Sequence, residues 1–90
     1  MATFGNVPRV VSVADTVVQP GEITIGGFRW TAPAFGGDTV TVQDDAGHII
    51  WSATTSGANI DQVEHFPRPR RYPGHKVSQI TSGILFIYRE

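Results

Sequence analysis

A short stretch rich in proline and arginine holds the residues best suited to bind a partner. Residues 66–76 read Phe-Pro-Arg-Pro-Arg-Arg-Tyr-Pro-Gly-His-Lys and contain four of the seven Lys and Arg residues of the chain. Spaced prolines keep a backbone extended, and arginine can bind a carboxylate or a phosphate through two parallel hydrogen bonds. The segment therefore predicts a docking site for an acidic protein surface at Arg68, Arg70, Arg71 and Tyr72. A solvated crossover loop whose prolines protect a sheet edge is an equally open alternative.

The other reactive residue types form no recognisable motif. His48, His65 and His75 are separated by 17 and 10 residues, which matches no metal-ligand spacing. Asp44 and Asp45 precede Ala-Gly and are better suited to cap a turn than to bind calcium. No serine lies in a nucleophile elbow. We expect no catalytic residue, no metal site and no cofactor.

Three aromatic residues could form a platform for a sugar. Phe28, Trp30 and Trp51 lie in stretches predicted to be strands. Aromatic side chains on the inward face of a strand usually fill the core, which is the favoured interpretation here. A carbohydrate- or peptide-binding module is kept as the alternative function.

Size and charge limit the possible partners. The chain has 90 residues, a net charge of −1 and no cysteine. It is expected to be a single domain, residues 1–90, in which residues 1–8 could form an extended arm. The near-neutral charge and the few aromatics beside the arginines argue against nucleic acid. No signal peptide or membrane span is apparent, so we expect a soluble protein made in the cytoplasm.

The chain is predicted to fold as a small antiparallel β-sandwich or barrel of about seven strands. No window shows helical periodicity, and ten glycines and six prolines separate short stretches rich in Val, Ile, Thr and aromatics. Residues 67–74 are expected to be an extended segment that cannot pair as a central strand, because proline lacks the amide donor. The expected strands cover residues 9–18, 22–32, 39–43, 48–54, 61–66, 75–80 and 84–88.

Turn chemistry and alternation refine these strands. Pro20-Gly21 predicts a turn, and Gly26-Gly27 predicts a bulge, because the apolar residues change parity across it. Residues 44–47 predict a hairpin. Two apolar faces are expected in addition, one in residues 9–18 at Val11, Val13 and Val17, and one in residues 48–54 at Ile49, Trp51 and Ala53.

The last strand is apolar on both faces. Ile84, Phe86 and Tyr88 share one parity, and Leu85 and Ile87 share the other. One face should meet the core, so the other must meet a second layer. We therefore expect Leu85 and Ile87 to be covered by another subunit, which predicts a homo-oligomer, or by a second sheet of the same chain.

The second half of the chain resembles small β-sandwich structural proteins of bacteriophages. The matching residues are TVQDDAGHIIWSA, with a strand leading out of an Asp/Gly hairpin, and HFPRPRRYPGHKVSQITSGILFIY, which ends in a Ser-Gly turn and an apolar strand. This resemblance covers about half of the chain and implies a virion component. Its implied role is that of a head decoration or cement protein, or of a head–tail or tail accessory, with other virion proteins as partners. It implies no catalytic residues.

Overall fold

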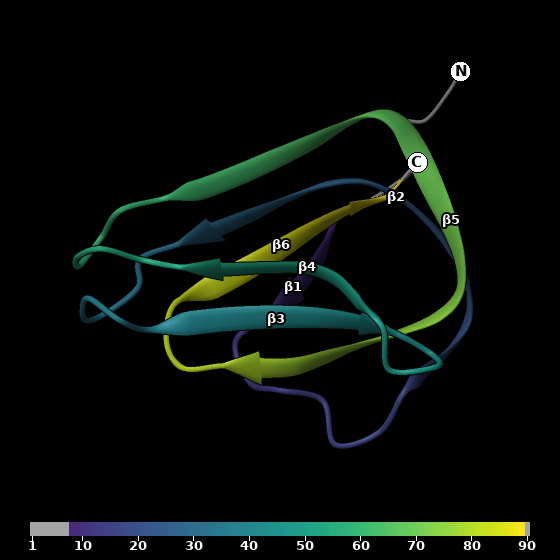
Figure 1. Ribbon diagram of the computed structural model, residues 1–90, viewed down its shortest axis with the longest axis horizontal. Coiled ribbons are helices and arrows are strands. Elements are labelled where there is room, and N and C mark those ends of the chain that lie inside the picture. Colours follow the sequence, from purple (N-terminus) through teal and green to yellow (C-terminus); the bar gives the residue numbers. More distant parts are fainter. Residues whose placement is uncertain (1–7, 90) are drawn as a thin grey trace.

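The computed structural model describes residues 8–89, which form a single antiparallel sheet of six strands (Figure 1). The strand order is β1-β6-β2-β5-β3-β4. The all-β antiparallel fold predicted from the sequence is therefore confirmed. The expected arm at residues 1–8 falls almost wholly outside the described residues. The strands are β1 (Arg9–Val11), β2 (Gln19–Thr31), β3 (Thr39–Asp44), β4 (Ile49–Thr54), β5 (Gln62–Ile80) and β6 (Ile84–Arg89).

Two long strands bend the sheet into two layers. The first part of β5 pairs with β2, whereas its last residues, 75–80, pair with β3. Figure 1 shows β5 curving around one end of the molecule, so that β3 and β4 lie across β6 and β1. The Phe28 ring from β2 stacks on the Trp51 ring from β4, with centroids 4.8 Å apart. This contact joins the inner surfaces of the two layers.

Residues 67–74, expected to be an extended segment that cannot pair as a central strand, belong to β5 and pair on one side only, with β2, among the described strands. Tyr72, Arg71 and Arg70 pair with Ile23, Thr24 and Ile25 of β2. The prolines do not prevent this pairing, because they lie where the ladder is interrupted. The four residues 66–69 fall between the His65 and Arg70 pairs, and residue 73 falls between the Tyr72 and Gly74 pairs. The two strands predicted at 61–66 and 75–80 thus become one, and seven expected strands become six.

The bulge in β2 is confirmed at the expected glycines. Both ladders of β2 shift register between Ile25 and Gly27. Ile25 before the shift and Phe28 after it are both fully buried. The bulge therefore lets odd-numbered residues before it and even-numbered residues after it point to the same core. A Cβ atom at Gly27 would overlap the carbonyl oxygen of Glu64, so this position requires glycine. By contrast, Pro20-Gly21 does not end a strand as expected. The two residues lie inside β2 at a register shift, where Gly21 has a φ of +102°.

The first strand is shorter than predicted. β1 ends at Val11, and Val13 and Val17 are 76% and 64% exposed, so the expected apolar face over residues 9–18 is wrong beyond Val11. The reason is a nonlocal contact. The backbone N–H of Asp15 donates to the Val77 carbonyl at 2.8 Å. Residues 12–18 therefore cross from the β1–β6 layer to the last part of β5.

The hairpin between β3 and β4 is confirmed. Oδ1 of Asp44 accepts from the backbone N–H groups of Ala46 and His48, both at 2.9 Å, and Gly47 has a φ of +88°. The face expected for β4 needs one correction, because Ile49 is 64% exposed whereas Trp51 packs against the core. A register shift between Val42 and Gln43 separates the two residues.

Leu85 and Ile87 are core residues, both with 0% exposure within the single chain. Their covering layer comes from the same chain, the second of the two alternatives stated for them. The expectation that they contact a partner is therefore corrected. The remaining core residues come from β1, β2, β3 and β5: Val11, Ile23, Ile25, Phe28, Trp30, Val40, Val42 and Val77.

Candidate interaction surfaces

The predicted arginines lie together on a free edge of the sheet. Residues 62–72 of β5 pair with β2 on one side, and the described residues place no strand on their other side. Arg68, Arg70 and Arg71 are exposed there. The Arg70 guanidinium lies 5.0 Å from the centroid of the Phe66 ring, and Arg71 forms an exposed ion pair of 3.6 Å with Glu22.

This arginine edge has the features of a protected edge strand. Three prolines remove amide donors from residues 62–73, and charged side chains oppose pairing with a foreign strand. The docking site and the protected sheet edge predicted from the sequence are therefore compatible on the same surface. An edge that disfavours pairing with a foreign strand can still present cations to an acidic partner. A hollow of about 350 Å³ lies between Pro67, Arg68, Pro69 and Arg70. Tyr72 differs from the arginines, since it is half-buried and packs against the core.

A second surface, the outer face, was missed in the sequence. The register aligns Val10, Phe86, Arg29 and Val63 in one row across β1, β6, β2 and β5. Val10 and Val63 are 57% and 54% exposed, and Ile84 beside the row is 38% exposed. Alternation in the last strand does separate Phe86 from Leu85, but local parity cannot tell which of the two faces the core.

A hollow of about 320 Å³ interrupts the outer face where Gly26 has no side chain. His65, Tyr88 and Arg29 surround it together with Val63. Arg29 pairs with Asp61 at 3.2 Å, and hydrogen bonds to Asp61 and Tyr88 raise the pKa of its guanidinium. The outer face thus has a largely apolar row in which the charged Arg29 lies between Phe86 and Val63.

A third cluster, Arg9–Asp15–His75, joins residues far apart in the sequence. The Arg9 guanidinium donates to both carboxylate oxygens of Asp15, at 2.5 and 3.0 Å, and lies 2.7 Å from Nε2 of His75. Gln19 and the Val77 N–H also donate to Asp15. Burial alone would raise the pKa of Asp15, but these hydrogen bonds, led by Arg9, hold it below the usual value.

His75 is held neutral in this cluster. It is 6% exposed, and burial, followed by the charge of Arg9, lowers the pKa of its imidazole. Because guanidinium can only donate, Nε2 of His75 must accept, so the ring proton lies on Nδ1. Nδ1 is buried and has no hydrogen-bond partner among residues 8–89.

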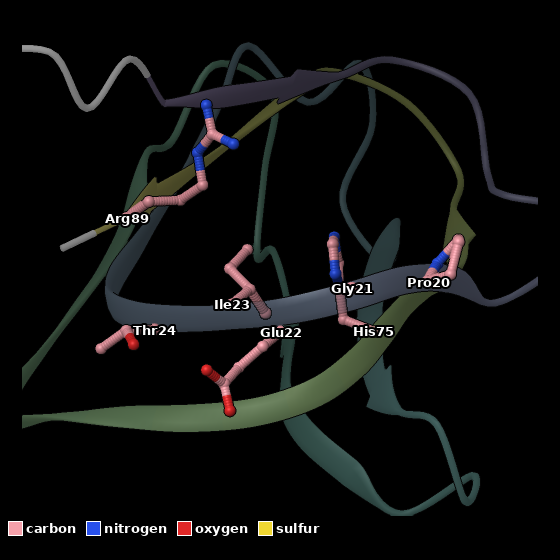
Figure 2. A pocket seen from close by; sticks show the side chains of 7 residues that line it. All are labelled: Pro20, Gly21, Glu22, Ile23, Thr24, His75 and Arg89. Atoms are coloured by element: carbon pink, nitrogen blue, oxygen red, sulfur yellow. The ribbon is translucent and has the colours of Figure 1, made fainter.

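A pocket of about 340 Å³ opens beside His75, where β2 leaves β6 (Figure 2). Figure 2 shows Ile23 and His75 on the side of β2 that faces Arg89, with Glu22 and Thr24 on the opposite side. Histidines without a motif spacing are most simply scattered surface residues, and for His75 the structure corrects this expectation, since the residue is buried. Its partners Arg9 and Asp15 are 66 and 60 positions away, so no local signal could reveal the cluster.

The aromatic residues considered as a sugar platform have structural roles instead. Phe28 and Trp30 are fully buried, and the indole N–H of Trp30 donates to the Ser82 carbonyl at 2.8 Å, so these rings offer no open sugar platform. Within residues 8–89, no three His, Asp or Glu side chains are grouped closely enough to hold a metal ion. The same residues include no helix that could span a membrane.

Comparisons with protein-family models, curated proteins and solved structures found no match to this chain.

Proposed function

We propose that this chain is a non-enzymatic structural subunit of a bacteriophage particle. It acts by packing against copies of itself and against other virion proteins, as a capsid decoration or cement protein or as a head–tail or tail accessory. The resemblance of residues 41–53 and 65–88 to phage β-sandwich proteins suggests the particle. The main support for the packing role is the exposed apolar surface of the outer face.

The composition of the outer face supports contact between proteins. Val10, Val63 and Ile84 expose apolar surface in one region, and Phe86 lies between them in the register. Apolar groups gathered on one side of a monomer are typical of an interface, and arginine is enriched in such interfaces. Arg29 lies within the row, between Phe86 and Val63, and pairs with Asp61. The arginine edge would supply a second contact, directed at an acidic neighbour.

Two exposed valines allow a test of self-association. We expect the purified protein to form oligomers in sedimentation velocity, and the double variant Val10→Ser/Val63→Ser to shift toward monomer at an unchanged melting temperature. Both side chains are more than half exposed, so their replacement should change stability by no more than about 0.5 kcal/mol. Phe35→Ser is the matched control, because Phe35 is 72% exposed in the loop after β2 and outside the outer face.

Mass spectrometry of purified particles tests the virion assignment. Particles of the phage that carries this gene should contain the wild-type protein in stoichiometric amounts, and the Val10→Ser/Val63→Ser variant in reduced amounts. A protein that is absent from particles would contradict the virion assignment. A wild-type protein that is monomeric at high concentration would instead contradict self-packing through the outer face.

A further inference from the structure

The Arg9–Asp15–His75 cluster connects the shortest strand to the opposite layer. β1 has three residues and pairs only with β6 among the described strands. Arg9 extends from β1 to Asp15, whose N–H and carboxylate are both bonded to Val77 of β5. Arg9 therefore gives β1 a polar attachment to the last part of β5, in addition to the packing of Val11 in the core.

The geometry around His75 makes this attachment depend on one proton. The lone pair on Nε2 accepts from Arg9 at 2.7 Å, so a proton added there would face a guanidinium at hydrogen-bond distance. Both groups would then be positive, and neither could accept. The charge of Asp15 acts on His75 as well, but both of its carboxylate oxygens already accept hydrogen bonds from Arg9.

Of the groups around His75, the Asp15 carboxylate favours the charged form, but burial and the two nearby cations oppose it. Burial opposes a charge, and Arg89 at the end of β6 adds a second cation nearby. Glu22 lies on the opposite side of β2 and is paired with Arg71. Asp44, the partner of His75 in the β3–β5 ladder, accepts hydrogen bonds in its own hairpin, and exposed Asp45 follows it there.

The neutral state is also imperfectly satisfied. A buried N–H without an acceptor destabilises the folded state, and Nδ1 of His75 has no acceptor among residues 8–89. Glutamine could accept from Arg9 at the same position. A histidine at this position is therefore not the residue that stability alone would favour.

We propose that His75 is a pH-sensitive latch for β1: neutral His75 holds Arg9, and protonation of Nε2 expels Arg9 and frees the strand. β1 carries Val10 of the outer face, so an open latch would also remove part of that face. This consequence rests on the proposed function, whereas the latch itself does not.

Hydrogen exchange tests the latch without any assay of assembly. Amide protection over residues 9–11, corrected for the intrinsic exchange rate, should fall between pH 7.5 and pH 5.0. A free histidine of pKa near 6.5 limits this loss to about 30-fold. His75→Gln should keep its protection at both pH values, because its amide oxygen accepts from Arg9 and does not titrate. His65→Gln, which changes an exposed histidine of the same strand, should behave as wild type.

Equal protection of residues 9–11 in the wild type at both pH values would overturn the latch. An equal loss in His75→Gln and wild type would also overturn it. If His75→Gln does not fold, ¹⁵N and ¹³C NMR of the wild-type histidines decides. The latch requires the Nδ1–H tautomer at neutral pH and a pKa of His75 below the ordinary histidine value of 6.5. The Nε2–H tautomer, or a pKa of His75 at or above the ordinary value, would contradict it.

Discussion

Asp15 serves as acceptor for two different parts of the molecule. Its carboxylate takes two hydrogen bonds from Arg9 and one from the Val77 N–H, and its side chain is only 8% exposed. Hydrogen bonds to a charged group in such a place contribute more than those at the surface. Asp15 therefore anchors the crossover between β1 and β2.

The variant Asp15→Asn should lower the free energy of unfolding at pH 7 by roughly 1.5–3 kcal/mol, the contribution of hydrogen bonds to a charged group. The pKa of Asp15 is lowered in the folded state. Its stabilisation is therefore present above the unfolded value of 3.8 and is lost as the pH falls through the folded value. Urea unfolding at pH 7 and pH 3 should show a large difference from wild type that shrinks in acid. Asp45→Asn, at an exposed hairpin position, should show little difference at either pH.

Gly83 closes the turn into β6 and has no room for a side chain. Its φ is +80°, and a Cβ there would lie 2.5 Å from the Thr31 carbonyl oxygen and 2.9 Å from the indole nitrogen of Trp30. Gly83→Ala should thus disturb the Trp30–Ser82 hydrogen bond as well as the turn.

A pair of glycine variants separates these effects. Gly47→Ala should cost about 1–3 kcal/mol, the strain of a left-handed backbone, because a Cβ at Gly47 would meet nothing within 4 Å. Gly83→Ala should cost clearly more, since the clash adds to the same strain. Thermal unfolding of both variants measures the difference. Equal losses would mean that the Gly83 turn can move away from Trp30.

At the scale of elements, β5 is the strand on which the two layers depend. It pairs with β2 over its first part and with β3 over its last part, and its prolines lie at the interruptions of the β2 ladder. The same segment leaves one edge free and charged. The arginines can therefore be removed without breaking the ladder, because their backbone pairing does not depend on the side chains.

The triple variant Arg68→Ala/Arg70→Ala/Arg71→Ala should fold with a nearly unchanged melting temperature but associate poorly with particles. Exposed ion pairs such as Arg71–Glu22 contribute about 0–1 kcal/mol, so little stability depends on them. Particle association measured by gel densitometry should also weaken with added salt in the wild type. Glu22→Ala breaks the same ion pair but keeps all three cations, and should associate normally. Normal association of the triple variant would leave the arginines as edge protection alone.

For the whole molecule, one chain supplies both layers around a small core. Leu85 of β6 and Trp30 of β2 are adjacent in the ladder and fully buried, and the fold thus closes over the last strand without a second subunit. The core and the outer face use opposite sides of the same strand. Stability and self-association should therefore respond to different residues of β6 and its neighbours.

Leu85→Ala should lower the free energy of unfolding by about 2–5 kcal/mol, because it leaves a cavity in the core. Val63→Ser, on the outer face, should lower it by no more than about 0.5 kcal/mol. Urea unfolding at low protein concentration measures both. A Leu85→Ala variant as stable as Val63→Ser would place Leu85 outside the core.

The sequence by itself determined the all-β class, most strand positions, the Gly26-Gly27 bulge and the hairpin at residues 44–47. These features depend on local physics: side chains alternate along a strand, and turns need residues that tolerate a positive φ or cap the backbone. The buried Val40 and Val42 of β3 follow from this alternation alone.

Only the tertiary structure decided which face of the last strand is inside, that residues 67–74 join β5, and that Val13 and Val17 leave the sheet. Each of these depends on which distant segments become neighbours, and local alternation carries no information about that. The Arg9–Asp15–His75 cluster shows the same limit, because three polar residues acquire a shared environment only when β1, the crossover and β5 meet. His75 belongs to this cluster because the fold buries it next to Arg9, and its residue type alone could not indicate that.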